Sequence, residues 1–120
     1  MQNAQETQLF QSLYKLLLAW HENCRIMPKM DRFTLGQKTG NLLLDMLTTT
    51  TSAYHVADQM QKRKLLLQAS TALENIKITI RLSKAVKVLK EQKYIEYQTK
   101  LQAIGKMLGG WIASLQKTIR

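Results

Sequence analysis

The stretch "MPKMDRFTLGQ", residues 27–37, interrupts a chain whose apolar residues otherwise recur at helical spacing. It holds the only proline, Pro28. Proline ends a preceding helix because it lacks an amide hydrogen, and it pushes Met27 out of the helical region. Thr34 and Gln37 have the spacing of a reciprocal capping box, in which each side chain satisfies a backbone amide of the first turn. The stretch therefore predicts a chain reversal with a new helix beginning near residue 34.

On either side of this reversal, apolar residues recur every three or four positions, which indicates amphipathic helices. The predicted helices cover approximately residues 6–25, 34–57, 60–90 and 92–118. A chain of 120 residues is long enough for one domain with one core. The economical architecture for residues 1–120 is an all-α fold, an antiparallel up-down-up-down four-helix bundle.

The second predicted helix contains four β-branched residues in a row, Thr48 to Thr51. Each costs about 0.5 kcal/mol relative to alanine in a helix, so propensity alone would favour a break. Leu43, Leu47 and Tyr54 nevertheless stay on one face across the run. We expect packing along this face to keep the helix continuous.

The helix predicted for residues 60–90 carries two apolar stripes on roughly opposite sides, whereas a helix in a monomeric bundle needs only one. The first stripe is expected to face the core of the bundle, and it contains Leu67, Thr71, Ile78, Leu82, Ala85 and Leu89. The second stripe is expected to meet another copy of the protein, and it contains Leu65, Ala69, Ala72, Ile76 and Ile80. Oligomerisation follows as a prediction.

Eighteen Lys and Arg against eight Asp and Glu give a formal net charge of +10, which indicates a polyanionic partner. Lys77, Arg81 and Lys84, with Lys87 at the margin, would form a basic strip suited to phosphates. Part of this strip has a plainer explanation, because lysines near a helix C-terminus are favoured by the helix dipole.

The connection at residues 27–37 adds Lys29 and Arg32 as candidate nucleic-acid contacts at one end of the bundle, with Phe33 expected to tie the connection to the core. In the last predicted helix, Gly105 and Gly109 are one turn apart and would let another backbone approach beside Trp111. A helix break at residues 109–110 is the alternative.

Catalytic chemistry finds no support in the sequence. His21 and His55 fall on different predicted helices, Cys24 is the only cysteine, and the carboxylates are scattered. We therefore expect no catalytic site, no metal site, no cofactor and no small-molecule substrate. The longest apolar run, residues 16–20, is far too short to span a bilayer, and the start has no leader pattern, so a soluble cytoplasmic protein without membrane association is expected.

Three stretches carry a family resemblance: "MPKMDRFTLGQ", "ENIKITIRLSKAV" at residues 74–86 and "GKMLGGW" at residues 105–111. Over about residues 13–115 the chain resembles the accessory variability proteins, Avd, of bacterial diversity-generating retroelements. That family belongs to a wider group of four-helix bundles that includes the ribosomal RNA intervening-sequence proteins.

The resemblance implies a basic homopentameric barrel that associates with the reverse transcriptase of the retroelement and with RNA or DNA. It implies no catalytic activity of the protein itself. Arg81 and its neighbours match the basic positions of the family's third helix, and Lys29 and Arg32 match its "PK…RFT" element. Two alternatives stay open: an intervening-sequence-type protein that binds structured RNA without a polymerase, and a pure oligomeric scaffold.

Overall fold

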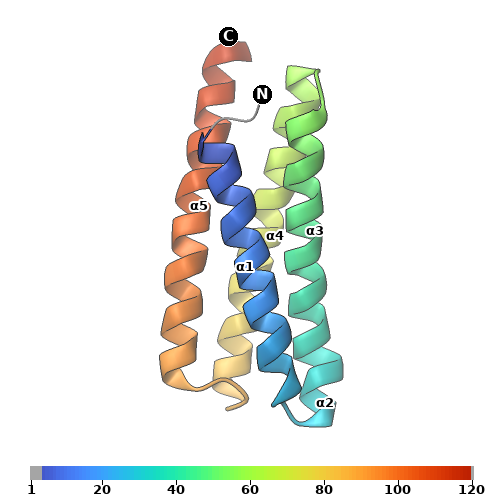
Figure 1. Cartoon of the computed structure of the whole chain (residues 1–120), viewed down its shortest axis with the longest axis vertical. Helices are drawn as coiled ribbons and strands as arrows, with labels where there is room; N and C mark the ends of the chain where they lie inside the picture. Colours follow the sequence, from blue (N-terminus) through green and yellow to red (C-terminus); the bar gives the residue numbers. More distant parts are fainter. Residues whose placement is uncertain (1–3, 120) are drawn as a thin grey trace.

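The structure is a computed structural model and describes residues 4–119, with side chains from Gln8 to Thr118. The outermost parts of the predicted domain, residues 1–3 and 120, lie outside the described residues. All regular structure in the described part is helical, and four long helices run antiparallel (Figure 1). The helices are α1 (Ala4–Arg25), α2 (Lys29–Asp31), the π-helical turn η1 (Arg32–Gly36), α3 (Gln37–His55), α4 (Gln59–Ala85) and α5 (Glu91–Ile119). The predicted all-α, four-helix architecture is confirmed.

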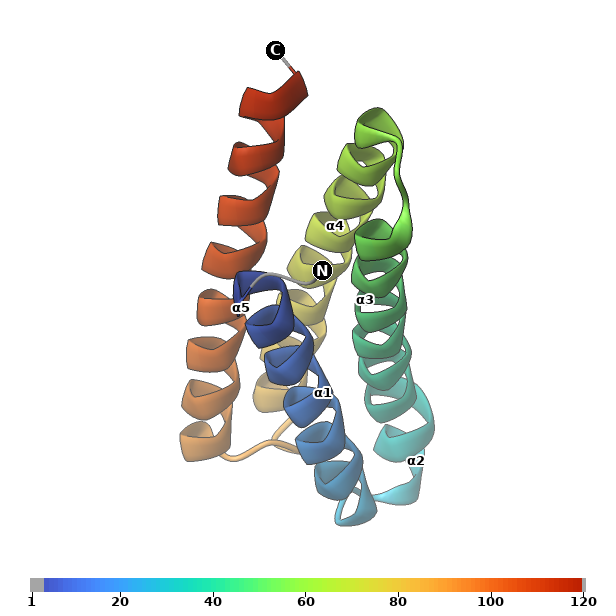
Figure 2. The ribbon, with the colours of Figure 1, turned by 45° about the horizontal axis from the view of Figure 1, so that its top comes forward.

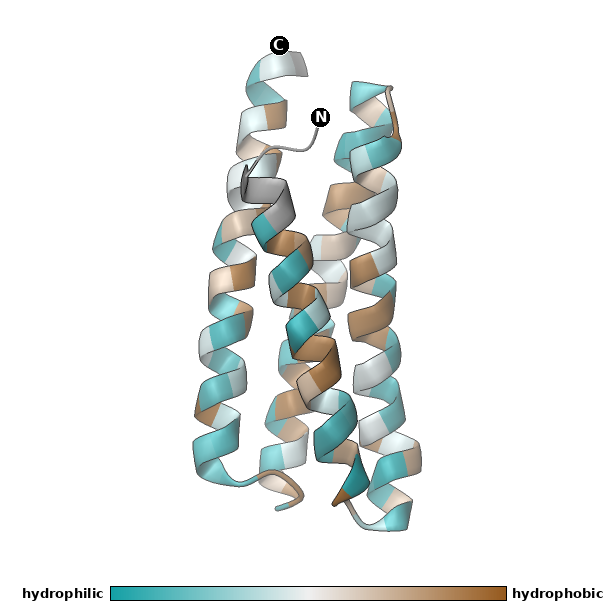
Figure 3. Ribbon diagram, in the orientation of Figure 1, coloured by the Kyte–Doolittle hydropathy of each residue, from teal (hydrophilic) through white to brown (hydrophobic). Residues whose placement is uncertain are grey.

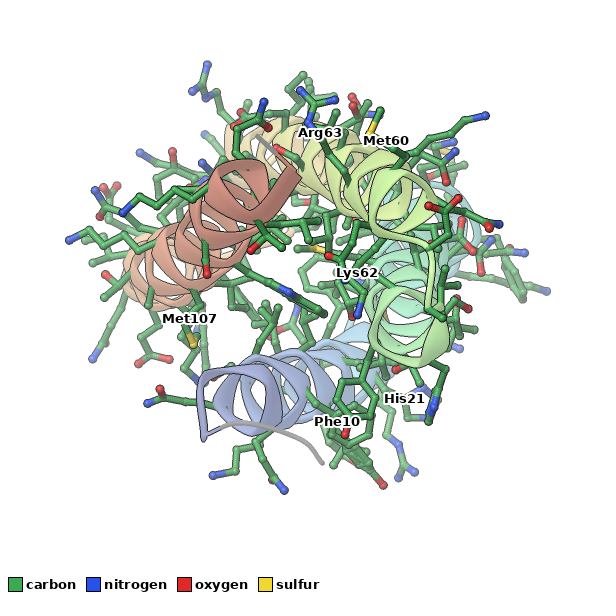
Figure 4. All side chains as sticks on the ribbon, turned by 90° about the horizontal axis from the view of Figure 1, so that it is seen from above. Phe10, His21, Met60, Lys62, Arg63 and Met107 are labelled. Atoms are coloured by element: carbon green, nitrogen blue, oxygen red, sulfur yellow. The ribbon has the colours of Figure 1, made fainter. Side chains whose placement is uncertain are left out.

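The four long helices occupy the corners of a square when the bundle is viewed down its axis (Figure 4). α1 packs against α3 and α5, and α4 packs against the same two helices, so α1 and α4 are diagonal. The bundle measures 48 × 22 × 21 Å. α1 begins below the upper end of the bundle, and the last turns of α5 extend past it (Figures 1 and 2). Hydrophobic residues recur along α1 and α3 between polar ones, as amphipathic helices require (Figure 3).

The core side of α4 differs from the prediction. Ile76 and Ile80 are 0% exposed and Ala69 is buried, while Leu65 and Ala72 are partly buried against the core. The five residues predicted to form an oligomer interface therefore face the interior of the bundle, and their assignment to a surface is wrong.

The other stripe faces solvent along α4, with Ile78 54% exposed and Leu82 47% exposed. Of its predicted members, Leu89 is buried as expected, and it lies beyond the end of α4. The physical reason for the exposed stripe is volume, because Leu66 and Leu73 flank the inner stripe and are both buried in the core. With them the inner side buries more apolar area than the outer stripe could.

The threonine run does not interrupt α3, so the predicted continuity is confirmed. Three of the hydroxyls donate to carbonyls one turn earlier: Thr48 to Asp45, and Thr50 and Thr51 to Leu47, at 2.8–3.1 Å. These bonds pair the three hydroxyls within the helix, and the burial of Thr50 packs the run against the core. α5 is likewise unbroken at residues 109–110.

A polar contact crosses the core between α3 and α4. The hydroxyl of Thr39 donates to the hydroxyl oxygen of Thr79 at 2.7 Å, and Thr79 donates in turn to the carbonyl of Ile76. Ser83 completes the group by donating to the carbonyl of Thr79 at 2.8 Å. Each buried hydroxyl donor of this group is therefore paired, as burial requires.

The reversal of the two stripes on α4 can be tested by truncating one residue from each. Ile76→Ala should lower the free energy of unfolding by about 2–5 kcal/mol, because it leaves a cavity in the core. Ile78→Ala, two residues away on the exposed side, should change it by less than about 0.5 kcal/mol. Urea unfolding at low protein concentration measures both, and equal destabilisation by the two would contradict the burial described here.

Candidate nucleic-acid interface

Three of the predicted phosphate contacts lie together on the side of α4 that faces α5. The Nζ of Lys77 is 3.5 Å from a carboxylate oxygen of Glu74 on the same helix. Lys84 reaches across to Glu91 of α5 at 3.2 Å and lies 4.6 Å from the ring centroid of Tyr94. Arg81 is exposed, and none of the ion pairs within residues 4–119 includes it. Because exposed pairs contribute only about 0–1 kcal/mol, Lys77 and Lys84 can exchange their partners for a phosphate at little cost.

Lys87 does not continue this strip on the helix, because α4 ends at Ala85 and not near residue 90 as predicted. Lys87 takes up the left-handed backbone conformation, with φ of 66°, and it is the sole non-glycine residue with positive φ in the described chain. The amide of Lys87 donates to the carbonyl of Lys84, and the amide of Val88 donates to the carbonyl of Ser83. This is a Schellman motif with lysine where glycine is usual. Lys87 is exposed on the α4–α5 connection, beyond the end of the strip.

Arg32 is held by the end of α1. Its Nε donates to the carbonyl of Cys24 at 3.1 Å, and its Nη2 donates to the carbonyls of Arg25 and Met27 at 3.3 and 3.2 Å. The guanidinium thus adds donors to carbonyls at and just beyond the end of α1, and that of Cys24 also accepts from the amide of Met27 at 3.2 Å. Arg32 has a structural role that the sequence did not reveal. Lys29, exposed and outside the ion pairs of the described residues, is the freer cation of this connection.

Two further expectations for the connection are wrong. Phe33 is 60% exposed and does not tie the connection to the core; Met27, which is 3% exposed, does so instead. The predicted capping box is absent because the helical segment begins earlier than residue 34, with α2 directly after Pro28. The hydroxyl of Thr34 therefore does not cap a helix start, and it donates to the carbonyl of Met30. The helix reaches α3 through the five residues of η1, a wider turn that takes up one extra residue.

The carbonyl of Gly36, the last residue of η1, accepts a buried hydrogen bond from Nε1 of Trp20 at 2.9 Å. A side chain at this position would meet the sulfurs of Cys24 and Met27 at 3.1 and 3.2 Å. A side chain at residue 36 would therefore require these two sulfurs to move by a few tenths of an ångström. Gly105 has a related role, because a Cβ there would lie 3.3 Å from Leu73 of α4, whereas Gly109 has open space beside it.

Of the groups considered for chemistry, His21 and Cys24 lie one turn apart on α1, whereas His55 is the last residue of α3. Burial raises the pKa of the Cys24 thiol, an effect that Arg32 only partly opposes. Burial also raises the pKa of Tyr97 to about 12, with Cys24 and Glu96 adding to the shift. A thiol with a raised pKa is a poor nucleophile at neutral pH. Within the described part of the chain, no three His, Cys, Asp or Glu side chains are grouped so that they could hold a metal ion.

The structure also contains a groove that sequence reasoning missed. It lies between α1 and α3, has a volume of about 660 Å³, and is floored in part by Gly36 and Gly40. Leu18, Phe33 and Leu44 line it and are about half exposed. In the sequence, Leu18 and Leu44 are apolar residues that fall just beside the core-facing stripes of their helices. Apolar residues at such positions were the sequence signal that could have indicated this groove.

The fold and the composition together define a class: a basic antiparallel four-helix bundle in which α4 and α5 carry most of the lysines and arginines. None of the described helices has the length and apolarity needed to cross a membrane. No curated protein matches the chain. A family model described as bAvd-like matches residues 7–115, and the chain belongs to this family.

The role of Arg32 in closing α1 can be separated from its charge. Arg32→Gln should lower the free energy of unfolding by about 1–2 kcal/mol, because carbonyls at the end of α1 lose a charged donor. Lys29→Gln removes the same charge from the same connection and should change it by less than about 0.5 kcal/mol. Urea unfolding of the two variants provides the comparison, and a cap role is excluded if both are destabilised by the same amount.

The left-handed backbone at Lys87 predicts a stabilising substitution. Lys87→Gly should raise the free energy of unfolding by up to about 1 kcal/mol, because glycine adopts positive φ without steric cost. The control Lys87→Gln removes the same charge but keeps a Cβ at the positive φ, so it should bring no such gain. Thermal and urea unfolding would show the difference, and a destabilised Lys87→Gly would contradict the assignment of strain.

Proposed function

We propose that the protein is a non-enzymatic accessory subunit of a diversity-generating retroelement, acting as a homopentamer beside the element's reverse transcriptase in the bacterial cytoplasm. The observation that carries this proposal is the bAvd-like family match over residues 7–115. The formal charge of +10 on 120 residues supports a role next to RNA or cDNA. In this proposal the protein organises template and polymerase and contributes no reacting group.

The α4–α5 side offers the best surface for nucleic acid. On α4, Arg81 is ready for a phosphate without losing a partner, because it takes part in none of the ion pairs of the described residues, unlike Lys77 and Lys84. Lys77 and Lys84 flank it, and Lys87 extends the surface beyond the helix end. Strained residues persist where function needs them, which gives a reason for a lysine at a position where glycine would be more stable.

Genomic context separates the proposed function from its alternatives. A reverse transcriptase gene and a template repeat next to this gene would support the retroelement role. A location inside a ribosomal RNA gene would favour the intervening-sequence alternative.

Phosphate binding predicts a change in salt dependence. Arg81→Gln should weaken binding to every single-stranded RNA sequence and flatten the plot of log K against log[salt] by about 0.7 for each phosphate that is no longer neutralised, or by about 0.9 for a duplex. Lys100→Gln, an exposed lysine on α5, removes the same charge and should change the slope less. Fluorescence anisotropy titrations between roughly 50 and 200 mM salt would measure both slopes.

Lys87→Gly sharpens this test, because it should weaken RNA binding while making the fold more stable. Weaker binding could not then be attributed to unfolding. Equal slopes for the Arg81 and Lys100 variants would show a diffuse positive field with no defined strip.

A further inference from the structure

A second groove follows the contact between α4 and α5, on the side that carries the basic strip. The two helices run side by side from their connection at residues 86–90 (Figures 1 and 2). The groove has a volume of about 420 Å³ and shares no lining residue with the α1–α3 groove. One residue of α4 and one side of α5 line it: Lys77, Tyr94, Ile95, Gln98, Thr99 and Gln102.

The lining offers hydrogen-bonding groups that carry no charge. Among the described residues that line the groove, Lys77 alone is charged. Gln98 and Gln102 lie one turn apart on α5, and neither side-chain amide takes part in a hydrogen bond within the described residues. The hydroxyl of Thr99 donates to the carbonyl of Ile95 at 2.8 Å, so its oxygen remains as an acceptor. The groove therefore presents two unpaired amides, each with donors and an acceptor.

The cations stand along the α4 edge of this groove. Lys77, Arg81 and Lys84 are four and three residues apart, so they share one face of α4. Lys84 marks one end of the groove, because its Nζ lies 4.6 Å from the ring centroid of Tyr94. Charged groups thus border the groove on one helix, and neutral amides line it on the other.

This division matches the two parts of a nucleotide. Phosphate oxygens accept hydrogen bonds and attract cations, whereas the edges of the bases present donors and acceptors side by side. The amide of glutamine has the same pairing of donor and acceptor, and it can bind N6 and N7 of adenine with two hydrogen bonds.

The position of the amides in a groove favours an unpaired base. In double-stranded RNA the deep groove is too narrow for side chains to read the bases, whereas a base of a single strand can turn outward and enter a recess. An apolar protein surface is a poorer fit, because two amides without partners are costly to bury against it.

We infer that the α4–α5 groove takes an unpaired base of single-stranded RNA or cDNA. Gln98 and Gln102 contact the edge of the base, while Arg81 and Lys84 contact the neighbouring phosphates. The inference rests on the proposed function and deepens it, because it names the single strand as the ligand and assigns base recognition to α5. The strip on α4 supplies affinity for any sequence, and the amides on α5 supply discrimination between bases.

The test removes the amides one at a time. Gln98→Ala and Gln102→Ala break no hydrogen bond within the described residues, and alanine favours a helix, so the fold should be kept. Fluorescence anisotropy would measure binding to oligoadenylate, oligocytidylate and oligouridylate of equal length. The wild-type chain should favour oligoadenylate. Each substitution should lower that affinity by about 5-fold or more, the lower limit for a two-bond contact between amide and base, and bring the three affinities closer together.

The salt dependence separates base recognition from phosphate binding. Gln98→Ala and Gln102→Ala should keep the wild-type slope of log K against log[salt], because no cation is lost. Arg81→Gln should do the opposite, lowering the three affinities alike and flattening the slope. The same oligonucleotides made of DNA show whether RNA, cDNA or both occupy the groove, and the two glutamine variants should lose the base preference for each strand type that binds.

A matched control is Gln92→Ala, which removes an exposed amide from the first turn of α5, outside the groove. It should change neither the affinities nor the slope. Circular dichroism and thermal unfolding establish that each variant is folded.

Four results would overturn the inference. The first is a wild-type chain that binds the three oligonucleotides equally, and the second is a base preference that survives both glutamine substitutions. The third is a flattened salt slope in either glutamine variant, which would make the groove a phosphate site. The fourth is loss of polymerase binding with unchanged RNA and DNA binding, which would assign the groove to a protein. The proposed function is tested by genomic context and by the slope of Arg81→Gln, so its failure can be told apart from failure of the base contact.

Discussion

The indole of Trp20 donates a buried hydrogen bond to the carbonyl of Gly36 at 2.9 Å, and the geometry of the α1–α3 side depends on it. The bond joins the last buried position of α1 to the turn through which the chain enters α3. Glycine fits at this position without displacing its neighbours, because a Cβ there would lie 3.1 and 3.2 Å from the sulfurs of Cys24 and Met27. The bond also holds the ring of Trp20 edge-on to Tyr97 of α5, with ring centroids 5.4 Å apart. One aromatic residue thus fixes three helices at this end of the bundle.

That constraint explains why one connection is elaborate while the others are short. α3 must enter the bundle with Gly36 against α1, and the π-helical turn supplies the extra residue that brings it there. Arg32 and Met27 secure the two sides of the reversal, one by binding carbonyls and the other by burial. Arg32 and Met27 thus stabilise the fold, whereas the side chains of Lys29 and Phe33 are exposed and accessible to other molecules.

Much of the fold could be predicted from the periodicity of apolar residues, because burying one stripe per helix is the main source of stability. The continuity of α3 through its threonines followed from the same argument. The pattern could not decide which stripe of α4 faces inward, since two opposite stripes differ by a few side chains such as Leu66 and Leu73. It also could not show that Arg32 would serve α1, because a guanidinium bound to carbonyls looks in sequence like one free for phosphate. Lys77, Arg81 and Lys84 lie on α4, whereas Lys87 does not, because the helix ends at Ala85.

The contacts of the α1–α3 corner are also local along the chain. Arg32 reaches carbonyls five, seven and eight residues away, and Trp20 bonds a carbonyl 16 residues away. Closing such short loops costs little chain entropy. The ring contact between Trp20 and Tyr97, by contrast, must bring together residues separated by the whole of α3 and α4. The corner can therefore form early in folding and present an aligned α1–α3 pair, onto which α4 and α5 then dock.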